Sequence, residues 1–157
     1  MSFDISGGGM EKPYVKGALK LIVLDLLRKP NHGYGIMAEM EELYGIKLSA
    51  GTVYPILASL RRGGLIEVIE TGDRERKTYR ITEKGLDYLE KHGKELKETK
   101  RKLGAYKTFL ELGGNELKEA FKELFRRIDE LSDEQKEEVR KAFEDCARRI
   151  RLILLGD

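Results

Sequence analysis

Apolar residues in the first 62 positions recur three and four places apart, which is the spacing of amphipathic helices. Residues that start or stop helices bound these segments. Ser49 is suited to cap a helix N-terminus, and Gly45 stands where a left-handed C-terminal cap is needed. The pattern therefore predicts three helices, over residues 16–28, 33–44 and 49–62.

The third of these segments contains a proline, Pro55, which cannot donate a backbone hydrogen bond to the carbonyl of Gly51. A proline costs ~3 kcal/mol in an ordinary helix interior. We therefore expect this helix to begin late, near Tyr54, or to be irregular in its first turns. Either way, residues 52–54 are predicted to be displaced outward, which favours exposure of Tyr54 over packing beneath a neighbouring hairpin.

The pattern changes to that of β-strands after Gly63 and Gly64. Residues 65–70 are rich in apolar and β-branched side chains, residues 77–81 alternate between two faces, and the polar stretch 71–76 separates them. A hairpin is therefore predicted. The order helix, turn, helix, hairpin is that of a winged helix-turn-helix module, which places one helix in the DNA major groove and its hairpin, the wing, along the backbone.

Leucines recur every seven residues after Thr82, which is suited to cap a helix that begins at Glu83. One long helix is predicted up to the pair Gly113–Gly114. The other heptad seam is too polar for an autonomous coiled coil, so this helix needs cover from other helices. Two further helices follow, and Ser132 and Gln135 form a capping box for the last one.

These patterns define a mainly α-helical fold with a small β-hairpin. We divide the chain into a disordered N-terminus or cloning remnant at residues 1–12, a winged helix-turn-helix DNA-binding domain at 13–85 and a helical dimerisation region at 86–157. The dimer is expected because the C-terminal helices carry more apolar surface than the small winged domain can cover.

Composition narrows the class of protein further. Charged residues make up 37% of the chain, yet 30 Lys and Arg nearly balance 28 Asp and Glu, so the net charge is only +2. No apolar run approaches the ~20 residues that cross a bilayer, and the N-terminus lacks the pattern of a signal peptide. The single cysteine, Cys146, cannot form an intrachain disulfide. We therefore predict a cytoplasmic protein with no membrane partner.

Side chains that could perform catalysis or bind a metal form no known pattern. The stretch from His32 to Gly35 has neither the third glycine nor the following lysine of a phosphate loop, and His92 has no partner at metal-ligand spacing. We therefore predict no enzyme activity and no cofactor. The helix that begins at Gly33 is better suited to accept a DNA phosphate at its N-terminus.

The predicted recognition helix is unusual because residues 49–60 contain no charge. Base contacts are then expected from hydroxyl groups and from contact with thymine methyl groups. Basic residues on the flanks and the hairpin supply the attraction for phosphates, although residues 1–85 hold only 13 basic against 11 acidic residues. We predict DNA contacts from Lys16, Lys20, Gly33, Tyr34, Ser49, Thr52, Tyr54, Ser59, Arg61, Arg62, Arg74, Arg76 and Lys77, with Arg80 also available on the hairpin.

Several of these residues together resemble the PadR family of transcriptional regulators. The shared features are the His32-Gly33-Tyr34 start of the second helix, the Tyr54-Pro55 pair with Leu57 and Leu60 in the third, and the hairpin from Arg76 to Gly85. The resemblance covers about residues 16–89 in the expected order. Other winged-helix families share the apolar pattern but rarely the Tyr-Pro pair.

The resemblance implies a homodimeric repressor that binds a pseudo-palindromic operator in double-stranded DNA through its winged helices. It also implies that the C-terminal helices form the dimer interface, and some relatives release DNA when a small aromatic effector binds between the subunits. The chain has no tryptophan, so the stacking platform of multidrug-binding relatives is missing. The predicted interface residues are Leu89, Leu96, Leu103, Leu110, Phe121, Phe125, Phe143, Ile150 and Leu154.

A second interpretation is left open by the residues themselves. The uncharged third helix and the small net charge also suit a winged-helix module that docks with other proteins and reads no DNA sequence. The two interpretations differ in what the hairpin arginines do, since only a DNA reader needs them to contact phosphates.

Overall fold

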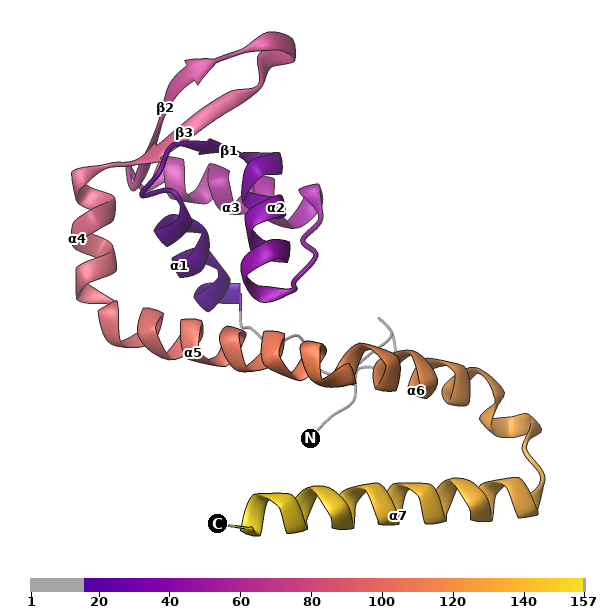
Figure 1. Cartoon of the computed structure of the whole chain (residues 1–157). Helices are drawn as coiled ribbons and strands as arrows, with labels where there is room; N and C mark the ends of the chain where they lie inside the picture. Colours follow the sequence, from indigo (N-terminus) through magenta and orange to yellow (C-terminus); the bar gives the residue numbers. More distant parts are fainter. Residues whose placement is uncertain (1–15, 157) are drawn as a thin grey trace.

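The computed structural model describes residues 16–156, so the expectation for residues 1–12 lies outside the described part of the chain. The N-terminal half is a compact domain of helices and one small sheet (Figure 1). Its elements are α1 (Lys16–Leu26), β1 (Asn31–His32), α2 (Gly33–Tyr44), α3 (Ala50–Arg62), β2 (Ile66–Thr71) and β3 (Lys77–Ile81). The mainly helical class with a small hairpin is confirmed.

The sheet has three antiparallel strands in the order β1-β3-β2, and β2 and β3 form the wing that projects from the domain. Strand β1 pairs Asn31 with Tyr79 and His32 with Thr78, so the wing is attached to the start of α2. Sequence patterning predicts the hairpin but misses β1, because two residues are too short to show any alternation.

The third helix begins earlier and more regularly than predicted. It starts at Ala50 behind Ser49, and Val53 is completely buried in the core. The expectation that residues 52–54 are displaced outward is therefore wrong. Pro55 lies in the second turn of α3, where it has no N–H to donate to the carbonyl of Gly51 and its ring crowds that carbonyl, and burial of Val53, Leu57 and Leu60 offsets this cost.

The long helix predicted after Thr82 is divided in two. Thr82 does cap it, through a bond from the amide of Gly85, but α4 (Glu83–Lys91) ends at His92, whose φ of −103° and ψ of 19° are not helical. Helix α5 (Gly93–Phe109) then turns away sharply from α4 (Figure 1). The heptad of leucines continues through this break, which is why the pattern alone does not show it.

Three of the heptad leucines belong to the core of one chain. Leu89, Leu96 and Leu103 are buried in the same cluster as the inner residues of α1, α2 and α3. Their assignment to the dimer interface is therefore corrected, because the winged domain already covers them. Leu110, at the end of this series, is only half-buried.

An ion-pair network attaches α5 to the winged domain beside these leucines. The carboxylate of Asp25 on α1 accepts hydrogen bonds from Arg28 at 2.8 Å and from Lys100 of α5 at 3.0 Å. Lys107 of α5 also donates to the backbone carbonyl of Glu42 at 2.8 Å. Burial alone would raise the pKa of Asp25, but the bonds and charges of Arg28 and Lys100 hold that pKa below its ordinary value.

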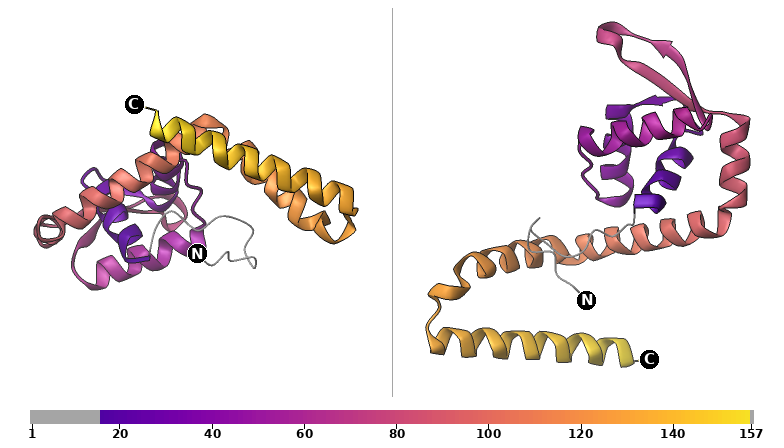
Figure 2. Two further views of the ribbon diagram at one scale, coloured as in Figure 1. Left: turned by 90° about the horizontal axis from the view of Figure 1, so that it is seen from below. Right: turned by 180° about the vertical axis from the view of Figure 1, so that it is seen from behind.

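The C-terminal helices extend away from this domain as an arm. A π-helical turn, Leu110–Gly114, leads into α6 (Asn115–Arg127), and α7 (Asp133–Leu155) runs back beside α5 and α6 (Figures 1 and 2). The predicted capping box is confirmed, since Ser132 and Gln135 exchange backbone bonds at the start of α7. None of the described helices has the length and hydropathy to cross a membrane.

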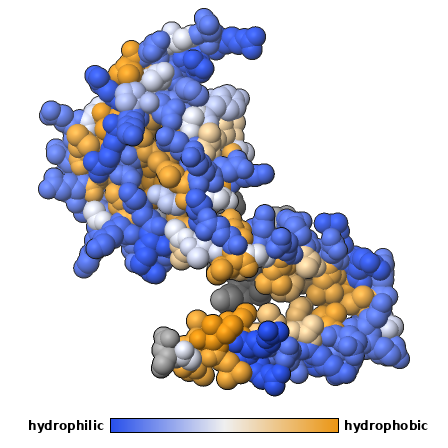
Figure 3. Space-filling model, in the orientation of Figure 1, coloured by the Kyte–Doolittle hydropathy of each residue, from blue (hydrophilic) through white to orange (hydrophobic). Residues whose placement is uncertain are grey.

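The arm leaves most of its apolar side chains uncovered. Between residues 110 and 156 the only buried residue is Gly114. Apolar surface lines the sides of α6 and α7 that face each other, with space between them (Figure 3). One pair bridges them, Phe121 and Phe143, whose rings meet edge to face at 5.6 Å.

The network at Asp25 makes a pH-dependent contribution to stability. We expect Asp25→Asn to lower the free energy of unfolding at pH 7 by about 1–2 kcal/mol, because two charge-assisted hydrogen bonds are weakened. A lowered pKa in the folded chain means that this stabilisation is complete above the ordinary value of 3.8 and is lost as the pH falls through the lowered value. Urea unfolding at pH 7 and at successively lower pH measures both effects.

The matched control is Asp145→Asn, which removes the partner of Arg148 on the exposed side of α7. We expect no measurable change, because exposed ion pairs contribute little. A pH-independent loss in Asp25→Asn, or an equal loss in both variants, would contradict the role given to Asp25.

Candidate nucleic-acid interface

The start of α2 is closed by a side-chain cap and exposes part of its first turn. His32 is its N-cap, and the Nδ1 atom of His32 accepts the amide of Gly35 at 3.0 Å. His32 is itself held by its backbone amide, which donates to the Asn31 side chain at 2.8 Å. Gly33 is buried against the Tyr54 ring, whereas Tyr34, the next residue of the first turn, is exposed and its amide has no acceptor within the helix. This helix end is therefore suited to accept a phosphate.

Tyr54 of α3 lies directly on this helix start. Its ring meets that of Tyr34 edge to face at 6.3 Å. A Cβ atom added to Gly33 would lie 2.8 Å from ring atoms of Tyr54, so only glycine permits this close approach. Tyr54 is 40% exposed, and partial burial raises the pKa of its hydroxyl above the ordinary value of 10.0. The predicted exposure of Tyr54 is thus found, although it is only partial.

The hydroxyl groups of α3 have partners within the chain. Ser49 Oγ and Thr52 Oγ1 are 3.1 Å apart, and Lys20 of α1 donates to Ser59 Oγ at 3.1 Å. These four predicted residues therefore form two local pairs. Ser49 caps α3 through its backbone position only, because its side chain accepts no amide of the helix.

The wing carries the other group of predicted residues. Arg74 lies in a short 3-10 turn, Asp73–Glu75, at the tip, with Arg76 and Lys77 leading into β3. Arg74 and Glu75 both have positive φ, 55° and 59°, which is uncommon for residues other than glycine. The tip of the wing is therefore a defined turn that carries exposed charge.

The basic residues of this region differ in whether they form an ion pair with an acidic side chain. Arg80 is paired with Glu67 across the wing at 2.8 Å. Within residues 16–156, the ion pairs that form include none of Arg61, Arg62, Arg74, Arg76 and Lys77. These five side chains are exposed, so their charges are available to an anionic partner.

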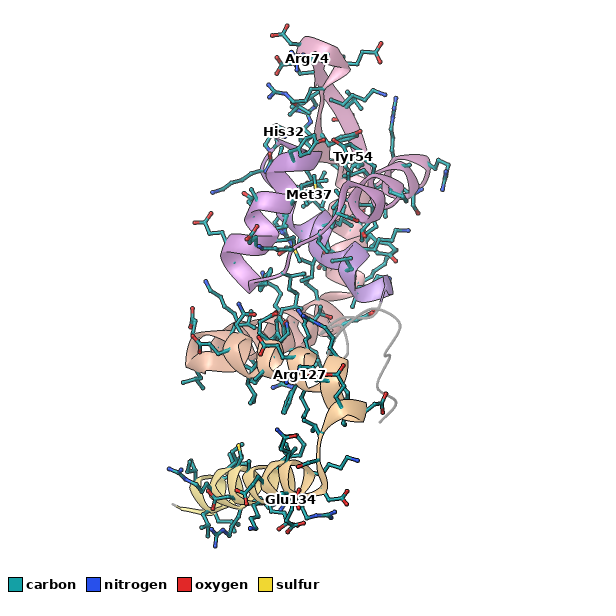
Figure 4. All side chains as sticks on the ribbon, turned by 90° about the vertical axis from the view of Figure 1, so that its right-hand side faces the viewer. His32, Met37, Tyr54, Arg74, Arg127 and Glu134 are labelled. Carbon is teal, nitrogen blue, oxygen red and sulfur yellow. The ribbon has the colours of Figure 1, made fainter. Side chains whose placement is uncertain are left out.

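The structure brings most of the predicted contact residues to one end of the molecule. His32 and Tyr54 lie below the wing, Arg74 lies at its tip, and Arg127 and Glu134 lie far away in the arm (Figure 4). Lys16 begins α1, but its side chain falls outside the described part of the chain. Acidic residues share this end, among them Glu70, Asp73 and Glu75 on the wing.

Sequence reasoning misses the role of His32 as the cap of α2. A side chain with an acceptor does stand immediately before the predicted helix. Histidine is not among the common N-cap residues, however, so its identity alone does not predict this cap. Within the described residues, no group of three His, Cys, Asp or Glu side chains could hold a metal ion.

Comparisons with known proteins show which sequences this chain is similar to. The sequence model of the transcriptional regulator PadR-like family matches residues 23–91, which span α1 to α4. No protein with a curated description matches the chain.

Solved structures of similar sequence are known. A PadR family transcriptional regulator from Eggerthella lenta is 36% identical, over 48% of this chain and 69% of that one, with a TM-score of 0.43. A PadR-like transcription factor from Bacteroides fragilis is 34% identical, over 54% and 87% of the two chains, with a TM-score of 0.45. A PadR-like transcriptional regulator from Bacillus cereus is 28% identical, over 61% and 90%, with a TM-score of 0.43.

The close approach at Gly33 can be tested by adding one methyl group. We expect Gly33→Ala to displace the Tyr54 ring and to weaken binding of double-stranded DNA by about five- to tenfold, equivalent to losing one or two polar contacts. Fluorescence anisotropy measures this affinity, with urea unfolding as a check on stability.

Gly104→Ala is the matched control, because a Cβ atom at Gly104 would meet nothing within 4 Å. This change should raise helix stability by about 0.5–1 kcal/mol and leave DNA affinity unchanged. Unaltered DNA binding in folded Gly33→Ala would show that the position of Tyr54 does not matter.

Proposed function

The chain belongs to the transcriptional regulator PadR-like family, and on this premise we propose that it is a repressor that binds a pseudo-palindromic operator as a homodimer. The observation that carries the proposal is the convergence of three features on one end of the molecule. The exposed Tyr34 at the start of α2, the exposed edge of Tyr54 and the unpaired arginines of the wing are the parts that a winged helix needs to hold DNA.

The charge distribution supports DNA as the partner. Arg61 and Arg62 close α3 at one end, and Arg74, Arg76 and Lys77 extend along the wing. Phosphate contacts of this kind position a protein on the duplex and supply most of its non-specific affinity. Sequence preference must then come from α3, whose centre is uncharged.

The uncovered arm supports the homodimer. Large apolar side chains on α6 and α7, such as Phe125, Ile150 and Leu154, are 54%, 50% and 77% exposed. Contiguous apolar surface of this kind marks an interaction site. A second copy of the chain offers the same surface, and two-fold symmetry in the protein matches a pseudo-palindrome in the DNA.

Regulators of this family are in general not enzymes, and we propose that this chain acts by binding alone, in the cytoplasm where its operator lies. A small aromatic effector remains a prediction.

Selection of DNA from a random pool identifies the operator, and charge reversal on the wing tests how it is held. We expect the double variant Arg74→Glu, Arg76→Glu to lose affinity for all DNA sequences, and the slope of log affinity against log salt to fall by about 2. Salt titrations with the selected operator and with a random duplex measure both quantities.

The control carries the same change in charge on α5, far from the wing. Lys94→Glu, Lys97→Glu should retain affinity, because both side chains are exposed and belong to α5, which lies at the other end of the winged domain from the wing (Figure 1). If the affinity for the selected operator does not exceed the affinity for random DNA, the proposal that the chain is a sequence-specific regulator is wrong. It would favour a protein-docking module, which would also keep its partner after reversal of the wing charges.

The dimer is tested by placing charge on α7. We expect Ile150→Asp, Leu154→Asp to sediment as a monomer and to lose the tight binding that two half-sites together provide. Leu43→Asp on α2 is the control, since Leu43 is 48% exposed on the winged domain and should leave the dimer intact. A dimer that survives the α7 charges would place the interface elsewhere.

A further inference from the structure

The outward side of α3 carries no polar side chain along its centre. Val53, Leu57 and Leu60 are buried and fix the inner side of the helix. With 3.6 residues per turn, the opposite side then ends at Arg62, and over its centre it carries Gly51, Pro55 and Ala58, all of which are exposed. We call these three residues the outer ridge of α3.

Hydrogen-bonding side chains lie on the two flanks of this ridge. On one flank, Thr52 is paired with Ser49, and Ser59 with Lys20 of α1. On the other flank, Tyr54 leans over the start of α2. The outer ridge itself offers only C–H groups and the backbone to any partner in front of it.

The small size of these residues affects how deeply α3 can enter a groove. A helix with ordinary side chains is about 10–12 Å across, and the DNA major groove is about 12 Å wide. Glycine, proline and alanine keep the surface close to the helix axis, so α3 can approach the floor of the groove. Arg61 and Arg62 at its end, and the wing beside it, can hold phosphates at the groove edges.

An apolar ridge in this position discriminates among the bases. A donor or acceptor on a base edge loses its hydrogen bond to water when an apolar side chain covers it. The C–H groups of the ridge offer no hydrogen bond in its place, so this contact is unfavourable. Thymine alone presents a methyl group in the major groove, and that group gains from the same contact. No arginine is present within residues 49–60 to read guanine in the usual bidentate way.

We propose that Pro55 and Ala58 read the operator by contact with the C5 methyl groups of thymines. This inference rests on the DNA-binding function proposed above and names what that function recognises. It differs from readout through the hydroxyls of α3, because those hydroxyls lie on the flanks and are paired within the chain.

Deoxyuridine tests the proposal, since it removes only the C5 methyl and keeps every hydrogen-bonding group of thymine. The operator selected from a random pool is resynthesised with deoxyuridine at one thymine at a time. We expect affinity to fall about three- to fivefold at each contacted thymine, the effect of one buried methyl group. Thymines outside the protected site are the internal control and should show no change.

A variant assigns the contact to its residue. Ala58→Gly removes the methyl of the ridge, so deoxyuridine should no longer matter at the thymine facing position 58. Ala105→Gly, at another exposed helical alanine, has the same cost to helix stability and should keep the full deoxyuridine effect.

The outcomes separate this inference from the proposed function. Absence of any preference for selected over random DNA defeats both. Specific binding without a deoxyuridine effect, or a selected half-site without thymine, overturns methyl readout and leaves the regulator standing. A deoxyuridine effect that Ala58→Gly retains in full at every thymine overturns the assignment to Ala58.

Discussion

The packing of α5 against the winged domain is the contact on which the rest of the structure depends. Leu96 and Leu103 lie in the same buried cluster as Leu24 of α1 and Met40 of α2, and Asp25 and Lys100 join across the edge of this contact. Burial of two leucine side chains contributes roughly 3–6 kcal/mol, more than the about 1–2 kcal/mol expected from the hydrogen bonds of the largely buried Asp25 carboxylate. The leucines therefore supply most of the energy that holds α5 against the winged domain.

This contact fixes where the reading surface lies relative to the arm. Because α5 is held against α1 and α2, the wing and Tyr54 are kept at the end of the molecule away from α7. The break at His92 is what allows α5 to return along the domain after α4 has left the sheet. A straight helix from Glu83 would have carried the leucines away from the core that buries them.

Local signals in the sequence predict the winged domain well, because each of its elements has its own apolar period and its own cap. The span of α2 and the left-handed cap at Gly45 follow from such signals. The errors arise where tertiary contacts decide the outcome. Burial of Val53 keeps α3 regular despite Pro55, and the break at His92 interrupts a leucine repeat that continues on both sides.

In the candidate site, too, some features follow from local sequence and others depend on tertiary contacts. The basic wing and Tyr54 can be chosen from the sequence, since charge and exposure follow from residue type and position. The pairing of Ser59 with Lys20 and the cap formed by His32 depend on distances between elements that no local pattern encodes. The prediction of Leu89, Leu96 and Leu103 as interface residues is wrong for a related reason, because periodicity shows that a face is apolar but does not show which surface covers it.

The end of α7 has a consequence for how this protein responds to its own abundance. Four successive residues, Leu152 to Leu155, are 62–80% exposed, so they point around the helix in several directions and need cover from more than one side. On the proposed assembly, only a second chain supplies that cover. While monomers predominate, the number of dimers rises with the square of the monomer concentration. The fraction of operator that is occupied would then change more steeply than the concentration of the chain. A modest change in expression of the protein would therefore produce a larger change in repression.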